Sequence, residues 1–114
     1  MNDTVALKPA HRIRVLNDNF RTMFIGGRIV MTQGVAELPL DLKARIILTV
    51  QSFADFNADN DPHGEHDFGS FELAGETYFF KVDYYSPDLN SGSEDPADPE
   101  KTARVLTIMC ADEY

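Results

Sequence analysis

Apolar and polar positions repeat with two different periodicities along the chain, and the first half of the chain has the periodicity of a helix. In residues 9–22 apolar side chains recur every three or four positions, which predicts an amphipathic helix that ends at Gly26-Gly27. Residues 40–56 carry a broader apolar face at the same spacing and predict a second helix. Between them, residues 28–32 are a short run of β-forming residues, which predicts a strand.

The second half of the chain has the alternating periodicity of strands. Apolar and polar residues alternate over residues 70–85, which predicts a β-hairpin with one buried face. Phe79 breaks the polar positions of the other face and indicates a second apolar surface. Residues 86–101 contain three prolines and five acidic residues, so no regular element is expected there. Residues 104–111 are apolar on both faces, which predicts an interior strand.

The order of the predicted elements is α-β-α-β-β-β. Helices that are separated from a hairpin in the sequence favour an α+β fold. We therefore expect a single domain over residues 1–114, with an antiparallel sheet of about four strands and two helices packed on one face.

Composition narrows the class of protein. The chain has 114 residues, of which 43% are hydrophobic, as in globular proteins. It contains no apolar run of about eighteen residues, so no membrane span is predicted. The N-terminal residues lack the basic-then-apolar layout of a signal peptide. Cys110 is the single cysteine, which excludes an internal disulfide and, with the missing signal, predicts a cytoplasmic location.

The charge is distributed unevenly. The formal net charge is −9, but residues 1–54 contribute +3 through seven Lys/Arg and four Asp/Glu. Residues 55–100 contribute −12 through thirteen Asp/Glu and one lysine, and residues 101–114 balance. Repulsion from phosphate groups argues against direct binding to nucleic acid. The charge instead favours a basic protein partner, a metal ion or mimicry of nucleic acid, while a purely solubilising role is the alternative.

A basic face is predicted on the first helix. It consists of His11, Arg14 and Arg21. We expect these side chains to pair with the acidic loops of the same chain or of a second copy. The second arrangement predicts a homodimer, because the oppositely charged surfaces of two copies complement each other.

The segment 59–67 suggests metal chemistry. Imidazole and carboxylate groups bind divalent transition metals, and the candidate ligands are His63, His66, Asp61 and Asp67. The spacing does not match the helical pattern of metalloproteases. The alternative is a structural loop, in which the aspartates cap turns and the histidines hydrogen-bond to carboxylates.

The acidic loops also suggest a surface for a partner. The candidate partner-binding residues are Asp59, Asp61, Glu65, Asp67, Asp88, Glu94, Asp95, Asp98 and Glu100. Prolines make residues 86–100 a semi-rigid arm on one interpretation and a flexible linker on the other. No catalytic residue is predicted, because Cys110 lies in an apolar strand and no nucleophile elbow or phosphate-binding glycine loop is present.

Several sequence segments, taken in order, resemble those of a family of small acidic bacterial proteins of unknown function that are found on plasmids and in phage-derived regions. The segments are Asp59–Gly69, Lys81–Tyr85, Gly92–Pro99 and Arg104–Met109. The resemblance extends from Ile13 to Tyr114 and implies no activity. It does imply a mobile-element setting, in which small acidic proteins often look like inhibitors of host defence nucleases.

Three hypotheses follow. The leading one is a non-enzymatic acidic interaction protein that inhibits a nucleic-acid-binding defence complex, of the anti-CRISPR or anti-restriction type, by DNA mimicry or by blocking a basic surface. The alternative is a metal-dependent hydrolase or metal-binding enzyme that uses His63-x-x-His66. The third is a small-ligand binding module between the acidic loop and the hairpin.

Overall fold

The computed structural model describes residues 8–114 and has the expected α+β class. Its sheet has four strands. The elements are α1 (Pro9–Met23), β1 (Arg28–Met31), α2 (Gln33–Ala36), α3 (Leu40–Ser52), β2 (Phe68–Leu73), β3 (Glu76–Tyr85), the 3-10 turn η1 (Pro99–Lys101), β4 (Ala103–Cys110) and the 3-10 turn η2 (Ala111–Glu113). Within the described residues, no helix combines the length and apolarity that crossing a bilayer requires.

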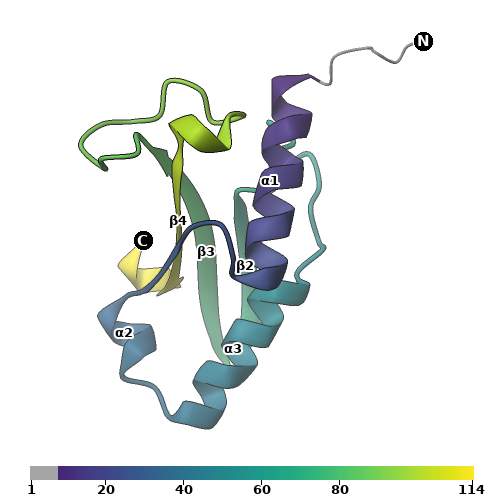
Figure 1. The fold of residues 1–114 in the computed structure, drawn as a ribbon. Helices are drawn as coiled ribbons and strands as arrows, with labels where there is room; N and C mark the ends of the chain where they lie inside the picture. The colour runs from purple at the N-terminus through teal and green to yellow at the C-terminus, as the bar shows by residue number, and fades with distance from the viewer. Residues whose placement is uncertain (1–7) are drawn as a thin grey trace.

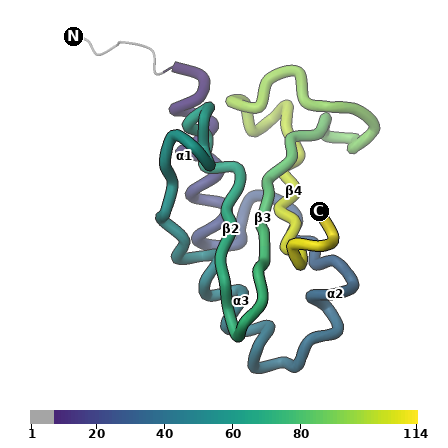
Figure 2. The backbone as a smooth tube through the Cα atoms, turned by 180° about the vertical axis from the view of Figure 1, so that it is seen from behind, coloured from purple at the N-terminus to yellow at the C-terminus, as the bar shows by residue number. Residues whose placement is uncertain are grey.

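The helices α1 and α3 cover one face of the sheet (Figure 1), and the view from behind shows the strands in front of them (Figure 2). The core lies between these two layers, where alternate strand residues meet the apolar faces of the helices. It consists of Phe20, Val35, Ile46, Val50, Tyr78, Phe80, Val82, Leu106 and Ile108.

The sheet is mixed and not purely antiparallel, so the prediction was wrong for β1. The strand order is β1-β4-β3-β2, and β1 runs parallel to β4 with Arg28 opposite Val105. No hairpin turn sets the direction of β1, because helices follow it in the chain. The apolar Ile29 and Met31 reach the core face in either direction, so periodicity could not decide between the two.

The hairpin and the interior strand are confirmed. β2 and β3 pair antiparallel, and the turn residues Ala74 and Gly75 have φ values of 53° and 83°. Positive φ at both central residues is the requirement of a type I′ turn. β4 lies between β1 and β3. On the second face of the sheet, the ring of Phe79 lies 5.2 Å from that of Phe68 and 5.6 Å from that of Tyr114, as the predicted second apolar surface requires.

The helix α3 ends at Ser52, four residues before the predicted end. Phe53 is extended, with a ψ of 131°. This bend brings the rings of Phe53 and Phe56 to 5.2 Å and 6.4 Å from that of Phe80. Aromatic burial therefore outweighs the further helical turn that the apolar spacing predicted.

Arg21 is buried against α3, so the prediction that it shares a basic face with His11 and Arg14 was wrong for this residue. Its side chain is 3% exposed and donates through Nη1 to the carbonyls of Val50 and Phe53, each at 2.9 Å. These carbonyls lie at the C-terminus of α3, where a cation is favoured by the helix dipole. Arg21 thus fastens α1 to the end of α3.

The segment 86–101 contains regular structure that the sequence did not predict. Residues Pro99–Lys101 form η1, and the Asp98 carboxylate accepts a hydrogen bond from the backbone N–H of Glu100 at 2.9 Å. Proline at the first position and aspartate at the cap are the ordinary start of a helical turn. Tyr85 and Gly92 also form an isolated antiparallel bridge.

Glu113 ties the C-terminal turn to the chain after β1. Its carboxylate accepts hydrogen bonds from Thr32 Oγ1 at 2.5 Å, from the N–H of Cys110 at 2.9 Å and from the N–H of Gly34 at 2.8 Å. The Thr32 hydroxyl, followed by the two backbone N–H groups, lowers the pKa of Glu113 from 4.5 to about 2. The ionised carboxylate is therefore the form that the fold stabilises.

We predict that Glu113→Gln reduces the acid sensitivity of the fold. Because the folded pKa lies below the unfolded one, this carboxylate contributes stability above about pH 4.5 that is lost as the pH falls toward about 2. Urea unfolding between these pH values should show a smaller fall in the free energy of unfolding for the variant than for the wild type. The neighbouring exposed variant Asp112→Asn serves as control, and an equal fall in all three proteins would contradict the assignment.

Candidate functional site

Two long acidic loops lie at the same end of the sheet, on either side of the N-terminal half of α1 (Figures 1 and 2). The α3–β2 loop spans residues 53–67 and the β3–β4 loop spans residues 86–102. Arg14 donates to a backbone carbonyl of the first loop at 3.5 Å. Arg12 lines a small apolar hollow together with Ala97 of the second loop. The helix α1 therefore contacts both loops and separates their acidic surfaces.

The α3–β2 loop is held by its own side chains. The carbonyl oxygen of the Asn57 side chain accepts from the backbone N–H of Asn60 at 3.1 Å. The Asp61 carboxylate, in a residue that is 8% exposed, accepts from the backbone N–H groups of Glu65 and His66, both at 3.1 Å. Short polar side chains that bond to nearby backbone are the usual device for fixing such a loop.

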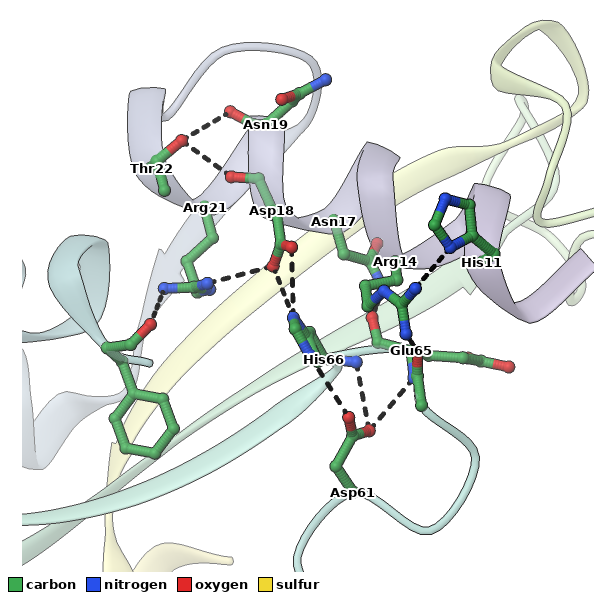
Figure 3. Close-up of polar contacts among 12 residues, drawn as sticks. His11, Arg14, Asn17, Asp18, Asn19, Arg21, Thr22, Asp61, Glu65 and His66 are labelled. Atoms are coloured by element: carbon green, nitrogen blue, oxygen red, sulfur yellow. Dashed lines mark hydrogen bonds and ion pairs between the residues drawn. The ribbon is translucent and has the colours of Figure 1, made fainter. Parts of the chain in front are cut away.

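His66 docks the α3–β2 loop onto α1 (Figure 3). Its Nδ1 atom lies 2.9 Å from Asp18 Oδ1, and its Nε2 atom lies 3.6 Å from Asp61 Oδ2. The ring stacks on Phe56 with centroids 3.8 Å apart and planes 4° from parallel. Both ring nitrogens therefore face carboxylates of this chain, as the structural alternative for the loop expects.

The buried side chain of Asn17 joins α1 to both loops. Its amide nitrogen donates to the backbone carbonyl of Glu65 at 3.0 Å and to Tyr84 Oη at 2.8 Å. Its carbonyl oxygen accepts from Arg104 Nε at 2.9 Å, and Arg104 also donates to the carbonyl of Pro96 in the β3–β4 loop. We call this group the polar hub; its members are Asn17, Glu65, Tyr84 and Arg104.

The ionisable groups of the polar hub are paired with one another. The Tyr84 hydroxyl donates to Glu65 Oε1 at 2.7 Å. Burial, followed by this hydrogen bond, raises the pKa of Tyr84 well above its ordinary value. Burial also lowers the pKa of Arg104, whose guanidinium lies 5.3 Å from the centre of the Tyr84 ring. Groups that satisfy each other in this way fix a structure and are poorly placed to act on a substrate.

The predicted partner-binding residues divide into two sets. The exposed ones are Asp59, Asp88, Glu94 and Glu100. The buried or half-buried ones are Asp61, Glu65, Asp67, Asp95 and Asp98. Four members of the second set, Asp61, Glu65, Asp95 and Asp98, bond to other groups of the protein: Asp95 accepts from the N–H of Ala97 at 3.2 Å, for example. Burial raises the pKa of Asp67. The acidic surface is therefore smaller than the sequence predicted.

Of the predicted metal ligands, His66 and Asp61 lie together, with Nε2 and Oδ2 3.6 Å apart. Among the residues that the structure describes, the group of three metal-binding side chains with donor atoms within 4.8 Å of one another is Cys110, Asp112 and Glu113. His63 is exposed, whereas His66 is held between Asp18 and Asp61. Metal binding by His63, His66, Asp61 and Asp67 remains a prediction.

The members of the polar hub other than Glu65 were not among the predicted site residues. Their positions carry a signal all the same. Asn17 lies four residues after Ile13 and three before Phe20 on the apolar side of α1. Tyr84 and Arg104 continue the inward alternation of β3 and β4. A polar residue in the place of a core residue indicates a buried hydrogen-bonded group.

We predict that Asn17→Ala lowers the free energy of unfolding by about 3 kcal/mol, because Arg104 and the Glu65 carbonyl lose buried partners. Asn19→Ala, at an exposed position on the same helix, should change it by less than about 0.5 kcal/mol. Urea unfolding of the two variants measures the difference. Equal effects would show that the hub contributes nothing specific.

Comparison with known proteins assigns the chain to a family. No curated protein and no solved structure matches the chain. A family model described as "Protein of unknown function (DUF3768)" matches residues 31–113, a segment that holds both acidic loops and strands β2 to β4. The resemblance to an uncharacterised family is thereby confirmed. Since the match spans well over half of the sequence, the chain belongs to the DUF3768 family.

Proposed function

We propose that the protein is a non-enzymatic interaction protein that binds a basic surface of a partner through its acidic loops. The observation that carries this proposal is a hollow of about 390 Å³ in the β3–β4 loop, with Glu94 and Glu100 among its lining residues. The Glu94 side chain is 77% exposed, and its ion pair with Lys101 is long, at 3.7 Å. An arginine of a partner could enter and form forked hydrogen bonds with these carboxylates.

The order of the β3–β4 loop supports the proposal. Ser93 Oγ donates to the carbonyl of Lys101 at 2.9 Å, and Asp95 and Asp98 cap turns within the loop. Arg104 donates a hydrogen bond to the carbonyl of Pro96 and so anchors the loop to β4. A loop that is already fixed loses less conformational entropy on binding, so its carboxylates can bind more tightly than those of a flexible linker.

The charge pattern defines the class of partner. Apart from Lys81, residues 55–100 contain no lysine or arginine, so the outward carboxylates have few basic partners, and Lys101 just beyond this range forms only a long ion pair with Glu94. In its most specific form, the proposal is that the partner is a nucleic-acid-binding defence complex in the cytoplasm, and that the carboxylates take the place of phosphates. The acidic charge and the resemblance to plasmid- and phage-borne proteins support this form.

The test is affinity capture from an extract of the source organism at about 50 mM and about 500 mM salt. Coulomb attraction between exposed groups is strongly screened at the higher concentration, so a specific partner should elute there. A variant with Asp88→Asn, Glu94→Gln and Glu100→Gln should lose this partner. The matched control carries the same charge change elsewhere, with Glu37→Gln, Asp41→Asn and Glu72→Gln, and should retain it.

Two outcomes would contradict the proposal. One is a partner whose retention is unchanged by salt. The other is a partner that the control triple variant loses as completely as the loop variant does, since net charge alone would then explain the binding.

A further inference from the structure

A third cavity lies at the opposite end of the sheet from the acidic loops. It is a cleft of about 350 Å³ between the first residues of β3 (Glu76–Tyr78) and the segment Cys110–Asp112 at the end of β4, with Leu38 as a third wall. Cavities of this size accommodate small organic molecules. None of the predicted site residues lines it.

A buried tyrosine in the wall of this cleft has an unused polar group. Tyr78 is 2% exposed, yet its hydroxyl forms no hydrogen bond with the described residues. Among the described residues, Arg21 Nε is the side-chain polar atom that is both fully buried and unpartnered, so the Tyr78 hydroxyl is not fully buried. The Tyr78 hydroxyl is therefore reached from outside, and the cleft is the opening that Tyr78 lines. A hydroxyl that is accessible from the cleft and has no partner in the protein is free to bond to a ligand.

The electrostatic environment of the cleft is negative. Glu76 and Asp112 lie on its rim, and no lysine, arginine or histidine occurs among the described residues that line it. The Cys110 thiol is kept neutral, because burial, the Glu113 carboxylate and Asp112 raise its pKa to about 11. Two carboxylates and a free hydroxyl around a small cavity favour a ligand that carries positive charge and hydrogen-bond donors.

A metal ion fits these groups less well. Cys110, Asp112 and Glu113 have donor atoms within 4.8 Å of one another. Both carboxylate oxygens of Glu113, however, already accept hydrogen bonds that connect η2 to the residues after β1. A metal would have to displace these bonds and also deprotonate the thiol. An organic cation needs neither change.

We propose that this cleft binds a small organic cation, namely a primary ammonium or guanidinium group on a short apolar chain. The cationic head lies between the carboxylates of Glu76 and Asp112 and donates a hydrogen bond to Tyr78 Oη. The apolar part contacts Leu38 and Ala111. The source of the cation is a free amine or a basic side chain of another protein, and both offer the same chemistry.

The experiment is a titration of the isotope-labelled protein followed by amide NMR shifts at about 10 mM salt, where screening is weak. n-Butylammonium is the probe and 1-butanol is its neutral counterpart. We expect the ammonium to shift residues 76–78 and 110–112 with a Kd of about 1 mM, as suits a ligand of about five heavy atoms. 1-Butanol should bind at least about tenfold more weakly.

Variants locate the site. Tyr78→Phe keeps the ring in the core and should raise the Kd about tenfold, because the hydrogen bond to a charged group is lost. Asp112→Asn, at an exposed position, should raise it as well, whereas Glu72→Gln on β2 should leave it unchanged. Lysine blocked at both backbone ends is a second probe: binding equal to that of butylammonium identifies a protein side chain as the source, and weaker binding identifies a free amine.

Four results would overturn the proposal. The first is the absence of shifts at residues 76–78 and 110–112. The second is equal binding of 1-butanol, which would show that the carboxylates do not select a cation. The third is a Kd that neither Tyr78→Phe nor Asp112→Asn alters. Tight binding of Zn²⁺ at Cys110 without binding of butylammonium would likewise replace the organic cation by a metal.

Discussion

The hydrogen bond between the Arg104 guanidinium and the Asn17 side chain determines where the two acidic loops of this fold lie. Arg104 is 3% exposed and Asn17 is fully buried, so each would leave an unpaired polar group inside the protein without the other. Arg104 also donates to Pro96, and Asn17 donates to the carbonyl of Glu65. One buried pair thus fixes α1, β4 and both acidic loops relative to one another.

Arg21 has the same role between the helices. Its guanidinium binds the C-terminal carbonyls of α3, contacts Asp18 Oδ1 at 3.1 Å and lies 5.5 Å from the centre of the Phe80 ring. Asp18 in turn binds His66 of the α3–β2 loop. A buried cation of this kind stabilises a structure only when its donors find acceptors, so the loop, α1 and the end of α3 have to assemble together.

The sequence predicted the elements whose side chains repeat regularly, namely α1, most of α3, the hairpin and the interior strand. Periodicity specifies which face of an element is buried, but it does not specify which strand lies beside it. The parallel pairing of β1 with β4 could therefore not be predicted from periodicity. Arg21 was grouped with His11 and Arg14 on a basic face, because a charged residue is rarely buried. Which carboxylates point outward depends on turns closed by side chains, such as the cap that Asp98 forms, and such local bonds to the backbone leave no periodic trace.

These contacts separate two roles for the acidic residues. Asp61, Glu65, Asp95 and Asp98 hold the loops in place, which leaves the outward carboxylates to meet a partner. The role proposed for the protein therefore depends on the polar hub, because a loop released from Arg104 would present its carboxylates in many positions.

Amide hydrogen exchange in the Asn17→Ala variant tests the central claim, that one buried side chain orders both loops. The informative amides are those of Glu65, His66, Ala97 and Glu100, which bond to side chains within the loops. The account predicts that exchange at all four accelerates relative to the amides of β3. Acceleration in only one loop, or in neither, would show that the loops are ordered independently of Asn17.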